Sequence, residues 1–421
     1  MVMTLKINVL RGQGQIGGSI IEVNTETTCI ILDAGANMNE KRSNIAVPKI
    51  QGLFEGKPAF DAVFVSHYHS DHMGLAEHVL DGIPIYMGKS AYMVKRALYE
   101  YKGQAMGFTP RFIKDGAAVT IGDITVTPIL CDHSAYESFM FLVSACGKTI
   151  LYSADFRSSG RPDFNAFLDT LPSVDTLICE GTNLHWDEDY HEPTEQELED
   201  LAAETLTRRH GPALIYLSAQ NIDRIITAYH AARRAGRRFI MDELSAVAAE
   251  AAGLDIDGYV LRASHSLADL GDIVATGLTA ERRRSAKVKA KRHLSDSFPA
   301  ISPRKAFASP DFLLCLTPQS LVNFRKVARR MSFKDGVFFF GRRETYMLKP
   351  AASAFIALMK SLGAEVPTLH TSGHGDAASI DQLIRSVEPS AIIPVHTERP
   401  DWFARYEDEC QVVYDCSDFE V

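Results

Sequence analysis

The sequence predicts an α/β protein in which sheets are covered by helices, with a second α/β domain inserted into the first. Three observations predict this fold. Short apolar and β-branched runs fill the first third of the chain, a βαβ-like pattern begins near residue 190, and the first pattern returns after residue 365. A chain of 421 residues is also long enough for two or three domains. We therefore expect one discontinuous domain, residues 1–190 and 366–421, and an inserted domain, residues 191–365.

The first domain should contain short strands and two early helices. Apolar runs bounded by turn residues predict strands at Leu5–Leu10, Ser19–Val23, Thr28–Leu32, Ala62–Val65, Ile124–Leu130, Phe139–Ser144, Thr149–Ser153 and Val174–Cys179. Helices are expected at Met73–Leu80 and Ser90–Tyr101. Near the end of the chain we expect a strand at Thr368–His370, a helix at Ala378–Val387 and a strand at Ala391–Pro394. Because hairpins come first and helices later, helix-covered sheets are favoured over a purely parallel fold.

The inserted domain is expected to alternate strands and helices. Thr194-Glu-Gln-Glu197 is a capping box, which predicts a helix that runs to about His210. A strand at Ala213–Leu217, a helix at Ile222–Ala235 and a strand at Arg238–Met241 follow. This order is that of a parallel βαβ unit.

Composition and charge narrow the function classes. The net charge of the chain is −9. Residues 281–334 carry fourteen Lys/Arg and three Asp/Glu, a net charge of +11, so the rest of the chain has a net charge of −20. Such segregation is typical of a surface that contacts a polyanion, although a solvated charged face gives the same pattern. No apolar run approaches the length of a membrane span, and the N-terminus lacks a signal core. Seven scattered cysteines without a CxxC pair predict reduced thiols and a cytoplasmic protein.

The strongest chemical signal is Ala62-Val-Phe-Val-Ser-His67-Tyr-His69-Ser-Asp71-His72. A buried strand runs directly into four residues of metal-ligating type. His67 and His69 are two apart, so extended backbone points both to one side, while Asp71 and His72 begin the next helix. Two imidazoles can serve one metal, and a carboxylate with a third imidazole can serve its neighbour. Three protein ligands that leave one coordination position open are typical of catalytic zinc.

Further ligands should come from other strand ends. His133 follows the strand Ile124–Leu130, and Asp155 follows Thr149–Ser153. Either residue alone is an ordinary polar loop residue. Together with the His67–His72 run, we interpret them as metal ligands, with Asp155 able to bridge two ions.

The pattern of His67, His69, Asp71 and His72, then His133, then Asp155 resembles the metallo-β-lactamase fold. That resemblance implies a four-layer αβ/βα sandwich with a dinuclear site at one edge. Asp33, in Ile-Leu-Asp33-Ala-Gly35, matches an early aspartate which in that family supports the metal loop rather than binding metal. The fold alone leaves the substrate open, since it hosts lactonases, thioesterases and nucleases.

Three later motifs resemble those of the beta-CASP nucleic-acid hydrolases, which include ribonuclease J. They are Ile-Cys-Glu180-Gly-Thr-Asn183, Ser372-Gly-His374-Gly and Ile-Ile-Pro-Val-His396-Thr-Glu398. Ser218-Ala-Gln-Asn221-Ile-Asp-Arg224 also resembles the strand-to-helix turn at the start of that family's inserted domain. By contrast, Leu316-Thr-Pro-Gln319-Ser320 stands where ribonuclease J relatives carry a Gly-Ser-Gln-Gly-like turn.

The resemblance implies a zinc-dependent phosphodiesterase that cleaves single-stranded RNA by a dinuclear-metal hydroxide mechanism, with 5′-phosphate products. Two Zn²⁺ per chain are implied. His67, His69 and His133 would hold one ion, Asp71, His72 and His396 would hold the other, and Asp155 would bridge them. The residues with catalytic roles would be His374, Glu180 and Asp71. The residues that would contact substrate are Ser372, Asn221, Arg224, Arg282, Arg283 and Arg284.

Two alternatives stay open at this point. A small-molecule hydrolase of lactones or thioesters would share the fold, although such a substrate needs neither an inserted domain nor a basic segment. A catalytically silent RNA-binding subunit is the second alternative, although every ligand position is filled. We expect no membrane partner. Endonuclease or 5′-exonuclease action and a homo-oligomeric state both stay open.

Overall fold

The computed structural model describes residues 4–38, 40, 42–184, 190–261 and 297–421. The chain divides into two compact units. The first contains Met1–Tyr92, Met106–Glu192 and Ser372–Val421, and the second contains Met93–Ala105 and Pro193–Thr371. The expected boundaries, after residues 190 and 365, lie a few residues before these. The assignment of 93–105 to the second unit was not expected.

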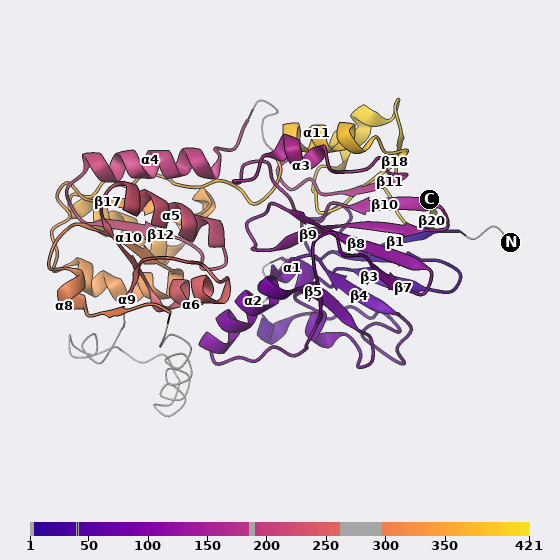
Figure 1. The fold of residues 1–421 in the computed structure, drawn as a ribbon, viewed down its shortest axis with the longest axis horizontal. Helices are drawn as coiled ribbons and strands as arrows, with labels where there is room; N and C mark the ends of the chain where they lie inside the picture. Colours follow the sequence, from indigo (N-terminus) through magenta and orange to yellow (C-terminus); the bar gives the residue numbers. More distant parts are fainter. Residues whose placement is uncertain (1–3, 39, 41, 185–189, 262–296) are drawn as a thin grey trace. The chain divides into compact units, whose positions relative to one another are not determined.

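Two mixed seven-stranded sheets form the first unit (Figure 1). In spatial order, the first sheet is β20 (Phe419–Glu420), β1 (Lys6–Arg11), β2 (Ile20–Asn24), β3 (Cys29–Leu32), β4 (Ala62–Val65), β5 (Ile85–Gly88) and β6 (Arg111–Ile113). The second is β19 (Gln411–Val412), β18 (Ala391–Pro394), β11 (Thr176–Cys179), β10 (Lys148–Tyr152), β9 (Ser138–Ala145), β8 (Ile124–Cys131) and β7 (Val119–Ile121).

The two sheets face each other across one apolar core. Side chains of both sheets, such as Ile21, Phe64, Phe141 and Ile393, belong to the same buried cluster. The opposite face of the second sheet packs on α3 (Phe164–Leu168) and α11 (Ala377–Val387). The apolar positions of α11 fall at helical spacing, which explains why this helix was predictable from sequence. The layers are those of a metallo-β-lactamase sandwich, and the predicted fold class is confirmed.

The directions of the strands in the second sheet decide which strand ends lie together. β10, β11 and β18 are parallel neighbours. β8 pairs antiparallel with β9, which pairs antiparallel with β10, so β8 runs the same way as β10. The carboxyl ends of all four strands therefore lie at one edge of the sheet.

Two local predictions were wrong. The expected helix Met73–Leu80 is a short α1 (Ser70–Met73) and a separate 3₁₀ turn, η2 (Ala76–His78). The backbone of residues 72–75 bonds to Ala34 instead of continuing the helix. Ala34 N donates to the His72 carbonyl, and Leu75 N donates to the Ala34 carbonyl. The expected strand Thr368–His370 is not a strand. It makes one isolated bridge, between Thr368 and Phe340 of β17, with Leu369 N donating to the Phe340 carbonyl.

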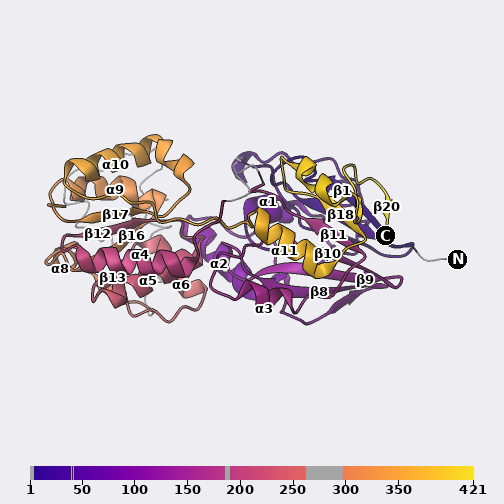
Figure 2. The ribbon, with the colours of Figure 1, turned by 90° about the horizontal axis from the view of Figure 1, so that it is seen from above.

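The second unit is a parallel six-stranded sheet with helices on both faces (Figure 2). Its strand order is β15 (Ala300–Ile301), β14 (Tyr259–Leu261), β13 (Arg238–Met241), β16 (Phe312–Leu316), β12 (Ala213–Tyr216) and β17 (Val337–Phe340). Its helices are α4 (Glu195–Arg208), α5 (Ile222–Arg234), α6 (Glu243–Ala251), α8 (Pro303–Ala306), α9 (Pro318–Ala328), α10 (Pro350–Ser361), the 3₁₀ turn η3 (Glu344–Leu348) and, divided between the units, α2 (Lys89–Tyr101). The predicted capping box of α4 is present, since Glu197 N donates to the Thr194 hydroxyl and Thr194 N to the Glu197 carboxylate.

Among the described helices, none combines the length and the apolar character that a membrane span requires. All seven cysteines are free thiols.

Candidate metal centre

Polar side chains collect at the shared carboxyl edge of the first unit. His133 follows β8, Asp155 follows β10, Glu180 follows β11 and His396 follows β18. His67 and His69 follow β4 of the facing sheet, and α1 carries Asp71 and His72. Residues far apart in sequence are thus brought together because their strands end at the same place.

The side chains form three overlapping groups of potential metal ligands. Within each group, the ligand atoms lie no more than 4.8 Å apart. The groups are His67, His69, His133 and Asp155; Asp71, His72 and His396; and Asp155, Glu180, His374 and His396. The first two contain the two predicted sets of protein ligands, and Asp155 belongs to the first and the third.

Hydrogen bonds at Nδ1 fix the tautomers of the imidazoles. His72 Nδ1 lies 2.7 Å from Asp33 Oδ2, and His133 Nδ1 bonds to the Gly373 carbonyl, so both nitrogens must donate. His67 Nδ1 lies 3.0 Å from the Ser66 hydroxyl, which itself donates to Asp33. When each ring is neutral, Nε2 is therefore left with the lone pair, which is the form that binds a metal.

These lone pairs converge on Asp155. Its carboxylate oxygens lie 3.1 Å from His72 Nε2, 3.6 Å from His67 Nε2 and 3.7 Å from His133 Nε2. Both oxygens of Asp155, with Nε2 of His67 and of His72, are buried and accept or donate no hydrogen bond within the described protein. Buried polar atoms are rarely left without partners. The donor set of imidazole and carboxylate therefore fits divalent ions of the zinc type.

Burial adds to this chemistry. It lowers the pKa of His67 and of His133 well below the usual value, with help from neighbouring imidazoles. Both rings are thus held neutral, as ligands must be. His69 Nδ1 lies 3.0 Å from His133 Nε2, an approach of two ring nitrogens that a shared cation would stabilise.

The backbone around the ligands adopts an uncommon conformation. Asp33, Ala154 and His396 all have positive φ, at 61°, 45° and 51°. Non-glycine residues adopt this region at a cost, and such residues cluster at functional sites. Ala154 directly precedes Asp155, so its backbone conformation sets the direction of the Asp155 carboxylate.

A second polar pair lies beside the ligands. Glu180 is fully buried and its Oε2 lies 2.8 Å from His374 Nδ1. Burial lowers the pKa of His374, but Glu180 and then Asp155 outweigh it and raise the pKa to about 9. His374 keeps about a fifth of its side chain exposed (21%). The imidazolium can therefore face a bound molecule while the carboxylate behind it holds the charge.

The matches with known proteins agree with this geometry. The model of a beta-lactamase superfamily domain matches residues 28–212, which include most of the ligands. Residues 28–212 of the chain therefore carry a domain of the beta-lactamase superfamily. A model described as a Zn-dependent metallo-hydrolase RNA specificity domain matches residues 361–409, which contain His374 and His396. This second match agrees with the beta-CASP resemblance of the motifs around His374 and His396.

Relatives match over nearly the whole chain. Ribonuclease J of Helicobacter pylori (strain ATCC 700392 / 26695) is 20% identical over 94% of this chain and 56% of its own length. Ribonuclease J2 of Bacillus subtilis (strain 168) is 21% identical over 94% of this chain and 69% of its own. The chain thus spans little more than half of the Helicobacter relative. A crystal structure of a protein of unknown function from Enterococcus faecalis V583 shares the fold, with a TM-score of 0.75, 18% identity and 99% coverage of both chains.

The residues predicted to contact substrate are distributed over both units of the chain. Ser372 lies in the first unit, where its hydroxyl accepts from Asn183 at 3.0 Å. Asn221 caps α5 in the second unit, accepting from Arg224 N. Arg282, Arg283 and Arg284 lie outside the described residues.

Arg224 requires a correction. Its side chain is fully buried, and its guanidinium pairs with the equally buried Glu195, with Nη2 3.0 Å from Oε1. Another guanidinium N–H donates to the Leu369 carbonyl. Because all of this group is enclosed, Arg224 holds α5 against α4 and the 369 segment and presents no charge to a substrate.

Several supporting residues of the centre were not predicted. Thr182 donates from its hydroxyl to Glu180 Oε2, and that hydroxyl lies 2.8 Å from His396 Nδ1. Asn183 donates to the His374 carbonyl. The Tyr152 hydroxyl donates to Asp33 at 2.8 Å. Thr182 and Asn183 stood inside the Glu180 motif, which was the only available signal.

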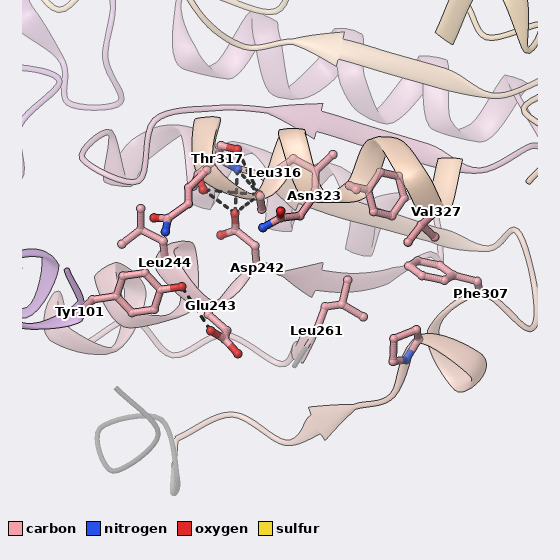
Figure 3. Close-up of a pocket in the computed structure, with 14 residues that line it drawn as sticks. Tyr101, Asp242, Glu243, Leu244, Leu261, Phe307, Leu316, Thr317, Asn323 and Val327 are labelled. Atoms are coloured by element: carbon pink, nitrogen blue, oxygen red, sulfur yellow. Dashed lines mark hydrogen bonds between the residues drawn. The ribbon is translucent and has the colours of Figure 1, made fainter. Parts of the chain in front are cut away.

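The second unit has a pocket of its own, of about 140 Å³, at the carboxyl ends of β13 and β16 (Figure 3). Asp242 lies on one side of it and accepts from Ser245 N at 2.8 Å and from Thr317 N at 2.7 Å. The carboxylate thus ties the first turns of α6 and α9 together. The Leu316–Ser320 turn is here, and its Ser320 hydroxyl also donates to Asp242, so the turn serves the scaffold.

Proposed function

We propose that this chain is a zinc-dependent phosphodiesterase that cleaves single-stranded RNA and leaves a 5′-phosphate. The observation that carries the proposal is the buried carboxylate of Asp155, facing three imidazole lone pairs, with the His374–Glu180 pair beside it. The RNA specificity description of the 361–409 match and the ribonuclease J relatives support the choice of substrate.

The protein residues have separable tasks in this proposal. His67, His69 and His133 would hold one zinc ion, and Asp71, His72 and His396 would hold the second, with Asp155 between them. Bound ions of this kind supply a nucleophilic water at neutral pH and neutralise charge on phosphate oxygens. Asp33 and Ser66 hold His72 and His67 in the ligating tautomer.

His374 would act on the leaving group. Glu180 accepts from Nδ1, so the imidazolium still carries a proton on Nε2. That proton can pass to the 3′-oxygen of the departing nucleotide as its bond to phosphorus breaks, giving a 3′-hydroxyl. The positive ring also stabilises charge on the phosphate before the transfer. Positioned acid catalysis of this type contributes about 10²–10⁴ in rate.

One assay tests the proposal against its alternatives. The purified zinc-loaded protein is offered end-labelled single-stranded RNA, the same sequence as DNA, and a simple lactone. RNA cleavage to 5′-phosphorylated products supports the proposal. Lactone turnover without RNA cleavage would show a small-molecule hydrolase, and RNA binding without cleavage a silent subunit. Product lengths over time from 5′- and 3′-labelled RNA distinguish endonuclease from 5′-exonuclease action. We also propose a cytoplasmic location, where the free thiols would stay reduced.

A further inference from the structure

A cluster of cations lies at the carboxyl edge of the second unit's sheet, away from the pocket beside Asp242. Tyr216 ends β12 and is paired with Phe340, which ends β17; Gly341 and Arg342 follow. Open parallel sheets bind their ligands outside this edge. β17 is the last strand in the sheet order, and residues 365–369 bond along its outer side.

Arg342 is held in place by two tyrosines rather than by an acid. Its guanidinium carbon lies 4.0 Å from the ring centre of Tyr346 and 5.5 Å from that of Tyr216, and Nη1 donates to the Tyr216 hydroxyl at 3.3 Å. No carboxylate pairs with Arg342 within the described part of the chain. Elsewhere in this unit, Arg224 pairs with Glu195 and Arg209 with Asp335, whereas Arg237 and Arg238 donate to backbone carbonyls.

Further positive charge surrounds this guanidinium. Lys349 Nζ lies 4.2 Å from the Tyr346 ring centre, and Arg343 is exposed. Lys349 also occupies the N-cap of α10, a helix end that favours anions rather than cations. Glu344 is the one acid of the 341–350 segment, which keeps a net charge of +2. Arg342 itself is half-buried and oriented, and it pairs with no carboxylate among the described residues, which suits it to an external anion.

We propose that Arg342 and Lys349 bind phosphates of single-stranded RNA at this edge of the second unit. The planar fork of an arginine matches phosphate oxygens, and the two tyrosines fix its orientation before RNA arrives. The largely exposed Leu348 (84%) adds apolar surface beside these cations. This inference rests on the proposed function, because it names a surface for the same substrate.

The test measures RNA binding as a function of salt. The zinc-loaded full chain is titrated onto a fluorescent phosphorothioate RNA of about 20 nucleotides, which resists hydrolysis, at salt concentrations from about 50 to 300 mM. Arg342→Gln and Lys349→Gln should each weaken binding and reduce the log–log salt slope by about 0.7 per lost phosphate contact. Arg234→Gln is the matched control: it removes one exposed charge from α5 that already pairs with Asp200, and it should leave the slope unchanged.

The outcomes separate this inference from the function itself. Wild-type slopes for both Arg342→Gln and Lys349→Gln, with RNA still bound and cleaved, would overturn the inference alone. Failure of the wild type to bind any RNA would overturn the proposed function as well. Poly-glutamate binding that these variants abolish, with RNA binding intact, would assign the surface to an acidic protein and contradict the RNA assignment. Lys349 is exposed, so its variant stays informative if Arg342→Gln does not fold.

Discussion

The Thr182 hydroxyl lies 2.8 Å from His396 Nδ1 and 2.8 Å from Glu180 Oε2. A carboxylate can only accept, so the hydroxyl donates its proton to Glu180 and accepts the Nδ1–H of His396. His396 Nε2 is then left with its lone pair, 3.3 Å from Asp71 Oδ2. One threonine thus connects a metal ligand to the carboxylate behind the proposed acid.

Thr182→Val should weaken zinc binding while keeping side-chain volume. Losing the acceptor frees the His396 ring to rotate or to change tautomer, and supporting residues of this kind are worth about 10–100-fold in metal affinity. Titration with a competing chelator measures the change. Thr182→Ser keeps the hydroxyl and should bind zinc as the wild type does. Equal affinity for the Val and Ser variants would remove Thr182 from the mechanism.

Asp71→Ala combined with His72→Ala should reduce the zinc content from about two ions per chain to about one. These residues belong to the ligand group with His396 and not to the group with His67 and His69. Metal analysis after dialysis gives the count, and an unfolding curve shows whether the fold persists. Nearly all turnover should be lost, because a single ion would no longer serve both sides of the reacting phosphate. Full activity with one zinc would contradict the two-ion proposal.

His374→Ala should reduce RNA turnover by about 10²–10⁴ and leave both zinc ions bound. The reason is position: the ring is held by Glu180 and is partly exposed, whereas the rings of His67, His72, His133 and His396 are buried. His396→Ala, by contrast, should lose zinc. Metal analysis of both variants decides the assignment. Loss of metal from His374→Ala with retention in His396→Ala would show that the two roles are reversed.

Arg224→Met should destabilise the second unit rather than change RNA affinity. It would leave the Glu195 carboxylate buried without its partner, a loss of about 3–5 kcal/mol in the free energy of unfolding. Glu195→Leu together with Arg224→Met removes both charges and should recover much of that loss. Denaturant unfolding measures both variants. A stable Arg224→Met protein with weakened RNA binding would restore the original substrate assignment.

His370 should make the second unit less stable in acid. Burial, followed by the charge of Arg224, lowers its pKa to about 3, whereas an unfolded histidine titrates near pH 6.5. Between these values the unfolded chain binds the extra proton, so the stability present above about pH 6.5 is lost as the pH falls toward 3. The loss is at most about 1.4 kcal/mol per pH unit.

His370→Leu removes the titrating group, so its unfolding free energy should change less between pH 7 and about pH 5 than that of the wild type. Hydrogen exchange of the second unit's core strands measures this difference directly. Parallel pH dependence in the two proteins would show that His370 is not held neutral in the folded state.

Much of the metal centre was predictable because the ends of apolar strands can be recognised in the sequence. The His67–His72 run follows a continuous apolar strand, and His133 and Asp155 each come two or three residues beyond the end of another strand. Helix starts were equally visible where a capping residue marks them, as at Thr194. These signals are local: spacing sets which way neighbouring side chains point, and capping uses backbone groups only three residues away.

The sequence by itself thus determined the fold class, the ligand types and the order of the two chain units. Only the tertiary structure decided the hydrogen-bond partners that orient most of these imidazoles, because Asp33, Gly373 and Thr182 reach the rings of His72, His133 and His396 from distant parts of the chain. It also decided that Arg224 is enclosed by Glu195 and that Arg342 lies between two tyrosines. Burial and partner choice depend on groups distant in the chain, so an arginine that looks like a substrate contact in sequence can be internal once the helices pack.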